Sequence, residues 1–442
     1  MKNKKKILLF IFFVTTTLFI LIIYKGVNNQ FSFLSYDHKQ TLKKYIFPYQ
    51  LIDKYEKLIL ENNPVYREVE YKNNNKNIRI LRDLELSNKK TLKYLPLMDG
   101  FYSGIHDKHT SSGYIDFYND EFFILSSRGT LAYSKNINNS NFLKLIKNNI
   151  YDFIGIEHFS KNVWFSIKDL LIHKNKIFIS YTEEIEEYCW NTSVIYGEIN
   201  NENIVFKKLF SPKECIHTKN NPDKEFNAHQ SGGRLLSLDD NHILLTIGDY
   251  RSRFLAQDFN SVNGKIIKIN INDFDYKIIS MGHRNPQGLY YDKERNFILE
   301  TEHGPHGGDE INLLSMEQIN NNIILNYGWA IASAGEHYVL TEEKVKKYPL
   351  YKSHKKYGFI EPLKSFVPSI GISEITKIGP DNYVVGSMKD KSIYFFELDK
   401  KKKIINLERV EVFERVRDLT FYKNKLYLFL ENSSSIGVIK LN

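Results

Sequence analysis

The segment that decides the fold runs from Gly282 to Trp329 and reads GHRNPQGLYYDKERNFILETEHGPHGGDEINLLSMEQINNNIILNYGW. Two short apolar runs, Leu289–Tyr291 and Asn296–Glu302, flank a charged turn within it. This pattern is typical of two antiparallel strands joined as a β-hairpin. The segment therefore predicts a β-rich fold in which this hairpin is one structural unit.

The two ends of this hairpin carry groups that bind ligands. Residues that precede the first strand of a hairpin lie beside those that follow the second strand. We therefore expect Arg284 and Asn285 to lie next to Gly304 and Pro305. Arg and Asn side chains donate hydrogen bonds to anions and carbonyl groups, whereas the carbonyl oxygens of a glycine-rich loop suit a hard cation.

The same hairpin unit recurs along the chain from about residue 95 onward. Each copy has a turn residue followed by three or four apolar residues, and most copies follow another short apolar strand. The copies begin at Asp120, Asn175, Asn241, Asn296, Asn382 and Asn424. Because one hairpin cannot bury its apolar face alone, this repetition predicts an all-β fold, a six-bladed β-propeller. The long interval between the fourth and fifth copies predicts an insertion, and a β-sandwich is the alternative fold.

The N-terminus predicts a membrane anchor. Four lysines precede the uncharged run Ile7–Tyr24, which is long enough to span a bilayer as a helix. The basic flank is expected on the cytoplasmic side, which places the propeller in the periplasm of an inner-membrane protein. A cleaved signal peptide is the alternative. We therefore divide the chain into a signal-anchor transmembrane segment (1–28), a short stalk (29–94) and the propeller (95–442).

Composition and cysteine content narrow the class of protein further. The formal net charge is +9, but the lysines are scattered among many acids, so we expect no nucleic-acid partner. Cys189 and Cys215 are the two cysteines of the chain, and they form no CxxC motif. In an exported protein they predict a disulfide, and two buried thiols are the alternative.

Polar residues fall at equivalent places in the repeats. Loops that enter a first strand and leave a second strand lie at one end of a propeller, so these residues should ring one mouth of the channel. They are His229, Arg284, Asn285, Gly304, Pro305, Lys389, Arg415 and Arg417. Clustered cations repel one another unless an anion neutralises them, so the ligand should carry several carboxylates or phosphates. A histidine in such a ring can act as a base near neutral pH.

Two further residues predict a separate cation site. Glu310 and Tyr327 both stand next to glycines, where a carboxylate and nearby backbone oxygens can hold a structural Ca²⁺. A capped helix or a plain turn is the alternative.

With these motifs the chain resembles the glucose/sorbosone dehydrogenase family, which includes soluble glucose dehydrogenases and aldose sugar dehydrogenases that use pyrroloquinoline quinone (PQQ). The matching segments are His229–Arg234, Thr246–Asp249, Asn263–Ile266, Gly282–Gly288, Glu302–Pro305, Gly308–Asn312, Asn326–Trp329, Lys389 and Arg415–Arg417. The family's glucose dehydrogenases carry an acid just before the base histidine, where this chain has Ala228.

The resemblance implies roles for the ring residues. His229 would be the general base that removes the substrate hydroxyl proton. PQQ would be held by Arg284, Asn285, Lys389, Arg415 and Arg417. The carbonyl groups of Gly304 and Pro305 would hold the Ca²⁺ that polarises the quinone, and Glu310 and Tyr327 would belong to the family's second calcium site.

The resemblance therefore implies a PQQ- and calcium-dependent oxidoreductase, which the anchor predicted from the N-terminal residues would attach to the membrane. It would oxidise an aldose-type sugar or an alcohol hydroxyl by base-assisted hydride transfer to PQQ, and pass electrons to an acceptor in the respiratory chain. A calcium-dependent lactonase on the same fold is one alternative, although a neutral lactone needs no ring of cations. A non-enzymatic propeller that binds a ligand or a partner protein is the other.

Overall fold

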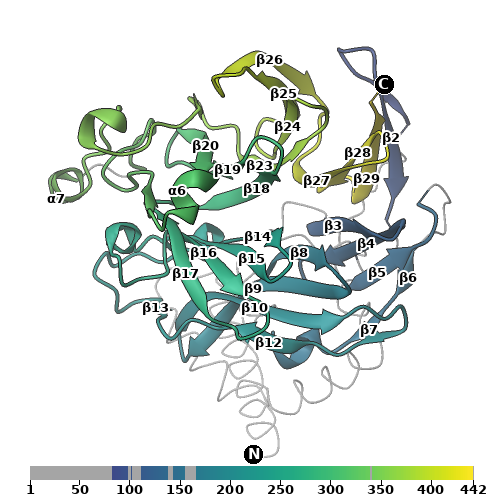
Figure 1. Ribbon diagram of the computed structural model, residues 1–442, viewed down its shortest axis with the longest axis horizontal. Coiled ribbons are helices and arrows are strands. Elements are labelled where there is room, and N and C mark those ends of the chain that lie inside the picture. The colour runs from purple at the N-terminus through teal and green to yellow at the C-terminus, as the bar shows by residue number, and fades with distance from the viewer. Residues whose placement is uncertain are drawn as a thin grey trace, which may run out of the picture. The chain divides into compact units, whose positions relative to one another are not determined.

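The computed structural model describes residues 82–97, 101, 111–137, 143–154, 166–338 and 341–441. Within these residues the strands form six antiparallel sheets around a common centre (Figure 1), so the predicted six-bladed propeller is confirmed. The predicted anchor and most of the predicted stalk lie outside the described residues. Among the helices of the described part, none has the length and apolar character needed to cross a membrane.

Each blade is built from four main strands, and its first strand lies nearest the centre. Blade 1 consists of β3 (Gly113–Tyr118), β4 (Glu121–Ser126), β5 (Leu131–Ser134) and β6 (Lys144–Leu145). Blade 2 consists of β8 (Ile167–His173), β9 (Lys176–Glu186), β10 (Cys189–Glu198) and β12 (Lys207–Phe210). Blade 3 consists of β14 (Gly232–Asp239), β15 (His242–Ile247), β16 (Lys265–Asn270) and β17 (Tyr276–Met281). Blade 4 consists of β18 (Pro286–Asp292), β19 (Phe297–Glu302), β20 (Asp309–Ser315) and β22 (Lys364–Phe366). Blade 5 consists of β23 (Ile372–Lys377), β24 (Asn382–Ser387), β25 (Ser392–Leu398) and β26 (Ile404–Glu411). Blade 6 consists of β27 (Val416–Tyr422), β28 (Lys425–Leu430), β29 (Ser435–Lys440) and β2 (Thr91–Pro96).

Short additional strands extend these sheets. They are β1 (Leu84–Glu85) beside β2, β13 (Ile216–His217) beside β10, and β21 (Leu325–Asn326) beside β17. The parallel pair β7 (Lys147–Asn148) and β11 (Asn203–Ile204) forms a separate two-stranded sheet.

The repeated unit in the sequence corresponds to the second strand of each blade. The six copies become β4, β9, β15, β19, β24 and β28, and each pairs antiparallel with the first strand of its blade. These strands are almost entirely buried; β19, for example, is buried at every position. A strand covered on both faces must be nearly continuously apolar, which is why the repeat is visible as apolar runs rather than as strict alternation.

The apolar faces pack between neighbouring blades. The described core contains one large cluster at each of the six seams, such as the cluster of Leu244 and Ile266 from blade 3 with Leu289 and Ile298 from blade 4. No blade buries its own faces, so each depends on its two neighbours for stability.

The ring closes through a strand that the sequence analysis assigned to the stalk. β2 pairs antiparallel with β29, with Leu92 opposite Ile439, so the last blade combines residues from both ends of the propeller. The propeller therefore begins before residue 95, the start expected from the sequence. The sequence repeat could not reveal this strand, because β2 lies far in sequence from the strand with which it pairs, β29, and is not part of a hairpin unit.

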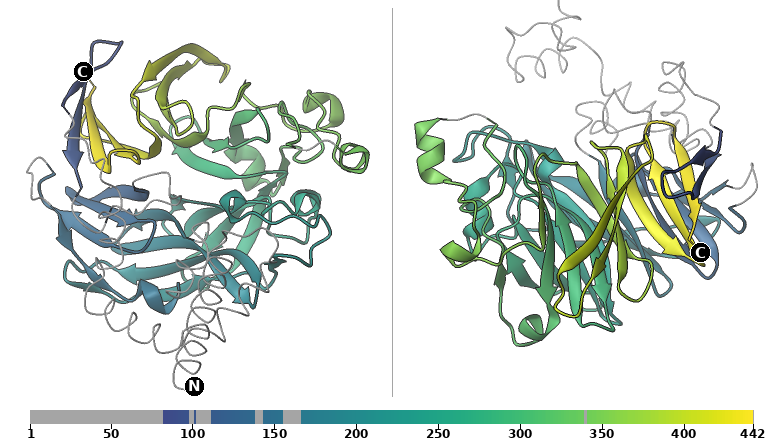
Figure 2. Two further views of the ribbon diagram at one scale, coloured as in Figure 1. Left: turned by 180° about the vertical axis from the view of Figure 1, so that it is seen from behind. Right: turned by 90° about the horizontal axis from the view of Figure 1, so that it is seen from above.

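The predicted insertion is confirmed between β20 and β22. It contains α6 (Met316–Asn320), α7 (Glu342–Lys347) and the 3₁₀ turn η4 (Lys355–Tyr357), and it projects from the edge of the ring (Figure 2). The insertion is tied to the loop before blade 3, because Asp223 accepts hydrogen bonds from Lys347 at 2.8 Å and from the Tyr348 hydroxyl at 2.7 Å. It therefore lies beside the segment that carries His229.

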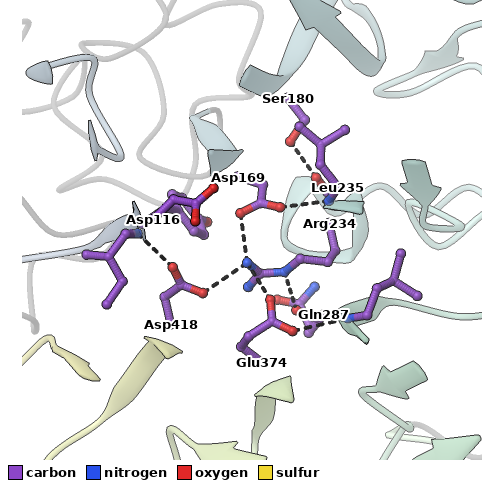
Figure 3. Close-up of polar contacts among 12 residues, drawn as sticks. Asp116, Asp169, Ser180, Arg234, Leu235, Gln287, Glu374 and Asp418 are labelled. Atoms are coloured by element: carbon purple, nitrogen blue, oxygen red, sulfur yellow. Dashed lines mark hydrogen bonds and ion pairs between the residues drawn. The ribbon is translucent and has the colours of Figure 1, made fainter. Parts of the chain in front are cut away.

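A buried guanidinium joins the first strands at the centre of the ring (Figure 3). Nη1 of Arg234 lies 2.7 Å from a carboxylate oxygen of Asp169, 2.6 Å from one of Glu374 and 2.9 Å from one of Asp418. Its Nε donates to the Gln287 carbonyl at 2.8 Å. These partners come from blades 2, 4, 5 and 6, so one side chain of blade 3 connects five of the six blades.

Cys189 and Cys215 form a disulfide, as predicted, with their Cα atoms 5.3 Å apart. The bond joins β10 to the loop that leads to β13.

Candidate active site

All eight predicted ring residues line one cavity with a volume of about 850 Å³. This volume is within the range of sites that enclose a small organic molecule. The residues brought together are His229, Arg284, Asn285, Gly304, Pro305, Lys389, Arg415 and Arg417. They come from blades 3 to 6 and are far apart in the sequence, and the fold brings them together at one mouth of the channel.

His229 is held by a short turn at the entrance to blade 3. It lies in the 3₁₀ turn η2 (Ala228–Gln230), where the Asn227 side chain caps the turn by accepting from the His229 N–H at 2.8 Å. The following Gly232 has a φ of +63°, a conformation that favours glycine, and its N–H donates to the Asn285 side chain at 3.1 Å. This hydrogen bond joins the segment that carries His229 to the predicted ligand-binding loop of the next blade.

The hairpin of blade 4 places its two loops side by side, as expected. Arg284 donates from Nη1 to the Gly304 carbonyl at 2.6 Å, and the His303 N–H donates to the Asn285 carbonyl at 3.1 Å. A Cβ on Gly304 would lie 2.0 Å from the Gly308 carbonyl oxygen, so this tight loop requires glycine. Asp309 accepts from the Gly304 N–H at 3.1 Å and fixes the loop further.

Arg415 and Arg417 share a buried counter-ion that the sequence analysis missed. Their Nε atoms lie 2.7 Å and 2.6 Å from the two carboxylate oxygens of Glu431. Although burial opposes ionisation, the two guanidinium groups lower the pKa of Glu431 to about 2. Glu431 holds both guanidinium groups in place at the cavity wall. Glu431 directly follows β28, whereas the two arginines lie at the start of β27, so no local sequence motif contains all three residues.

The cavity contains two further cations that the motifs did not reveal, Lys168 and Arg251. With the Gln230 amide oriented to donate to Asp249, its oxygen accepts from Arg251 at 3.2 Å and from Arg284 at 2.8 Å. Lys168 stands near the start of the inner strand of blade 2, and its only sequence signal is a charge inside an apolar strand.

These residues fit a polycarboxylate cofactor and a hard cation. Six Lys and Arg side chains line the cavity, against the lining carboxylates of Asp309 and Glu336 and the carboxylates of Glu431 and Glu225 that pair with three of the arginines. Asp309 is engaged by backbone N–H groups, and Glu336 pairs with Lys352 at 2.7 Å. The three carboxylates of PQQ would offset this excess of positive charge. The Gly304 and Pro305 carbonyl groups at the cavity wall are oxygen donors of the type Ca²⁺ takes, and at Gly304 the cation would share the carbonyl oxygen with Arg284 or displace the guanidinium from it.

Glu310 and Tyr327, predicted as a second cation site, line a smaller neighbouring pocket. Glu310 is buried together with Glu300 and Glu302, and desolvation raises the pKa of Glu300 and Glu310, with the neighbouring carboxylates adding to the effect. Oε1 of Glu300 has no hydrogen-bond partner among the described residues. The Tyr327 hydroxyl donates to the Leu313 carbonyl at 2.7 Å, which leaves its backbone carbonyl as the ligand this residue could offer.

Residues 168–439 match the family model described as glucose/sorbosone dehydrogenase. Among curated proteins, the chain is 26% identical to the aldose sugar dehydrogenase YliI of Escherichia coli (strain K12) over 285 residues, which cover 59% of this chain and 71% of that protein. It is 31% identical over 218 residues to the uncharacterized protein slr1608 of Synechocystis sp., a match that covers 42% of this chain and about half of that protein.

Solved structures show the same fold. The apo-form crystal structure of the soluble aldose sugar dehydrogenase from Escherichia coli has a TM-score of 0.58 at 19% identity, covering 79% of this chain and 98% of that one. The PQQ-bound aldose sugar dehydrogenase from Streptomyces coelicolor has a TM-score of 0.53 at 13% identity, covering 79% of this chain and 98% of that one. Together with the model match over more than half of its residues, the chain belongs to the glucose/sorbosone dehydrogenase family.

Proposed function

We propose that the protein is a PQQ- and calcium-dependent oxidoreductase that oxidises a hydroxyl group of an aldose-type sugar or an alcohol. The observation that carries this proposal is the single cavity in which a histidine, a glycine-rich carbonyl loop and six cationic side chains converge. Family membership, and a family relative whose structure contains PQQ, support the same activity.

The chain's own residues divide the work of binding. Arg415 and Arg417, held by Glu431, would bind carboxylates of the cofactor, with Lys389 as a further positive charge. Arg284 and Asn285 would position the cofactor beside the Gly304–Pro305 loop, whose carbonyl groups would hold Ca²⁺. Glu310 and Tyr327 would contribute to a separate, structural Ca²⁺ site.

His229 is the proposed base. It lines the cavity from a capped turn, and in its neutral form the imidazole would accept the proton of a substrate hydroxyl bound there. When bound, PQQ would supply the two-electron acceptor that takes the hydride from the same carbon. The substrate would thus lose two hydrogens, one as the proton that His229 accepts and one as the hydride, and leave as the carbonyl product.

An absorbance titration of the metal-free apoprotein with PQQ, with and without added Ca²⁺, tests the proposal. We expect tight, stoichiometric binding that requires Ca²⁺, followed by sugar-dependent dye reduction. Absence of PQQ binding at saturating Ca²⁺ would contradict the proposed function.

We also propose that the protein works outside the cytoplasm, with the apolar run near the N-terminus as its membrane anchor and a respiratory-chain component as electron acceptor. The disulfide between Cys189 and Cys215 supports an oxidising compartment. Fractionation of cells after alkaline extraction, with and without residues 1–28, tests the anchor.

A further inference from the structure

We propose that Lys168 is a specificity-determining residue that selects a sugar carrying an anionic group, a carboxylate or a phosphate, over a neutral aldose. The inference rests on the proposed function, since it concerns the substrate of the same site. It defines the substrate as an acidic sugar: the hydroxyl to be oxidised faces His229, and the anionic group faces the Lys168 ammonium.

Lys168 lies beside the proposed base although it belongs to a different blade. It is the second residue of β8, the inner strand of blade 2, and it lines the same cavity as His229. Its ammonium donates to the carbonyl of Ala228 at 3.3 Å, and Ala228 immediately precedes His229. A substrate hydroxyl close enough to His229 for proton transfer therefore brings the neighbouring atoms of the sugar toward this ammonium.

The position of Lys168 is fixed by close packing. A Cβ on Gly233 would lie 2.2 Å from the Cβ of Lys168, so the absence of a side chain at Gly233 makes room for the lysine stem. Gly233 has a φ of +108°, and its carbonyl accepts from the Ser180 hydroxyl on the next strand of blade 2. The strand packing thus directs the lysine toward the cavity.

Lys168 has no acidic partner among the described residues, a property that it shares with the Arg284 and Lys389 side chains but not with the remaining three cavity cations. Arg415 and Arg417 share Glu431, and Arg251 lies 3.7 Å from Glu225. Burial lowers the pKa of Lys168 to about 7, and the neighbouring Arg417 guanidinium adds to the effect. A partly desolvated ammonium beside another cation is costly unless an anion joins it.

The placement favours an anion on the substrate rather than on the cofactor. Arg284, Lys389, Arg415 and Arg417 already supply four cations for a tricarboxylate, and they come from blades 4 to 6, whereas Lys168 comes from blade 2. Lys168 is instead bonded to the turn that carries the base. A neutral sugar would leave the ammonium unpaired, whereas a uronate or a sugar phosphate would neutralise it.

The test compares the full-length wild type with Lys168→Met, which keeps the length of the side chain and removes its charge. Lys174→Met is the matched control, because Lys174 lies on the exposed turn at the other end of the same hairpin. Glucose, glucuronate and glucose 6-phosphate are titrated into each apoprotein by calorimetry, and PQQ is titrated separately at fixed Ca²⁺. The loaded enzymes are then assayed by dye reduction with the same three sugars.

We expect at least one anionic sugar to bind the wild type roughly tenfold more tightly than glucose, the order expected for one charge-assisted hydrogen bond. Lys168→Met should lose this preference, Lys174→Met should keep it, and Lys168→Arg should restore most of it. The sugar that shows the effect identifies the anion as carboxylate or phosphate.

Two results would overturn the inference. In the first, the wild type and Lys168→Met have the same affinity as each other for each of the three sugars. In the second, Lys168→Met weakens PQQ binding but leaves the preference among the sugars unchanged, which would make Lys168 a cofactor ligand. The apoprotein titrations do not depend on PQQ. Failure of the wild type to bind PQQ would therefore contradict the proposed function without removing a Lys168-dependent preference for acidic sugars.

Discussion

His229 acquires its proposed role from its surroundings rather than from any unusual local sequence. The Asn227 cap and the contact between Gly232 and Asn285 fix the turn that carries it. The turn brings the imidazole into the same cavity as Arg284, Arg415 and Arg417, whose guanidinium groups stay charged. This makes the histidine the one ring residue predicted from sequence that can exchange a proton near neutral pH.

His229→Gln should separate catalysis from cofactor binding. Glutamine preserves a polar side chain of similar size but cannot act as a base, so the rate of sugar-dependent dye reduction should fall by about 10²–10⁴-fold. PQQ affinity, measured by absorbance titration at fixed Ca²⁺, should stay within a few-fold of wild type because the cationic contacts remain. A variant that turned over sugar as fast as wild type would show that another group is the base.

Glu431 is the residue on which the arginine pair depends. The carboxylate is 1% exposed and bonds to both Arg415 and Arg417, so it keeps two guanidinium groups of the cavity at a fixed distance from each other. Removing it would leave two neighbouring cations without their shared counter-ion, a mechanism that typically costs several kcal/mol in a buried position.

The lowered pKa of Glu431 predicts a specific acid dependence of stability. Its pKa is about 2 in the folded protein and 4.5 for the unperturbed group, so the stabilisation is fully present above about pH 4.5 and is lost as the pH falls toward 2. From neutral pH to pH 3, the contribution of this group should decrease by about 2 kcal/mol.

Urea unfolding of wild type and Glu431→Gln at several pH values measures this dependence. The difference in unfolding free energy between the two proteins should shrink as the pH falls below 4.5, because Glu431 itself becomes protonated. A difference that stayed constant down to pH 3 would contradict the assignment.

At the scale of elements, the closing strand explains how an open series of hairpins becomes a ring. β2 contributes a fourth strand to the blade formed by β27, β28 and β29, and Leu92 is completely buried in the seam between blades 5 and 6. Without this strand, β29 would expose an unpaired edge. The integrity of the cavity depends on it, because Arg415, Arg417 and Glu431 all belong to this blade.

Leu92→Ala should lower the free energy of unfolding by about 2–5 kcal/mol, the range for removing a fully buried leucine side chain. Lys93→Ala, a change at the neighbouring position on the same strand, is the control and should stay within about 0.5 kcal/mol of wild type. Denaturant titration monitored by tryptophan fluorescence measures both. Equal stability of Leu92→Ala and wild type would show that β2 does not hold the ring closed.

At the scale of the whole molecule, Arg234 organises the centre of the propeller. The carboxylates of Asp169, Glu374 and Asp418 meet at its guanidinium group (Figure 3). Two of them also accept from the next blade's backbone: Leu235 donates to Asp169 at 2.7 Å, and Ile115 donates to Asp418 at 2.8 Å. The acids thus latch neighbouring blades to one another while the arginine neutralises part of their charge.

Arg234→Met should destabilise the whole propeller by about 3–5 kcal/mol, because it leaves buried carboxylates without their cation. The combined variant Arg234→Met with Asp169→Asn should recover part of the loss, since one of the unpaired charges is then removed. Thermal and denaturant unfolding measure both variants. A loss confined to blade 3, seen as local hydrogen exchange with unchanged global stability, would contradict the role of Arg234 as a link between blades.

The sequence by itself determined the fold class and most of the ring. Apolar hairpin strands must be buried on both faces, so their repetition is visible without coordinates, and the Gly282–Gly288 and Glu302–Pro305 loops are specified locally by glycine and proline. The neighbourhood of Arg284 and Gly304 was predictable because a hairpin brings its two ends together.

Only the tertiary structure decided the contacts between distant segments. The pairing of β2 with β29, the sharing of Glu431 by two arginines and the approach of Lys168 to the carbonyl before His229 all join residues that no local pattern connects. Such contacts form only when the ring closes. Side-chain packing at the six seams between blades then sets how the blades are placed relative to one another. The sequence specifies each blade through short-range periodicity, whereas the cavity exists only where the blades meet.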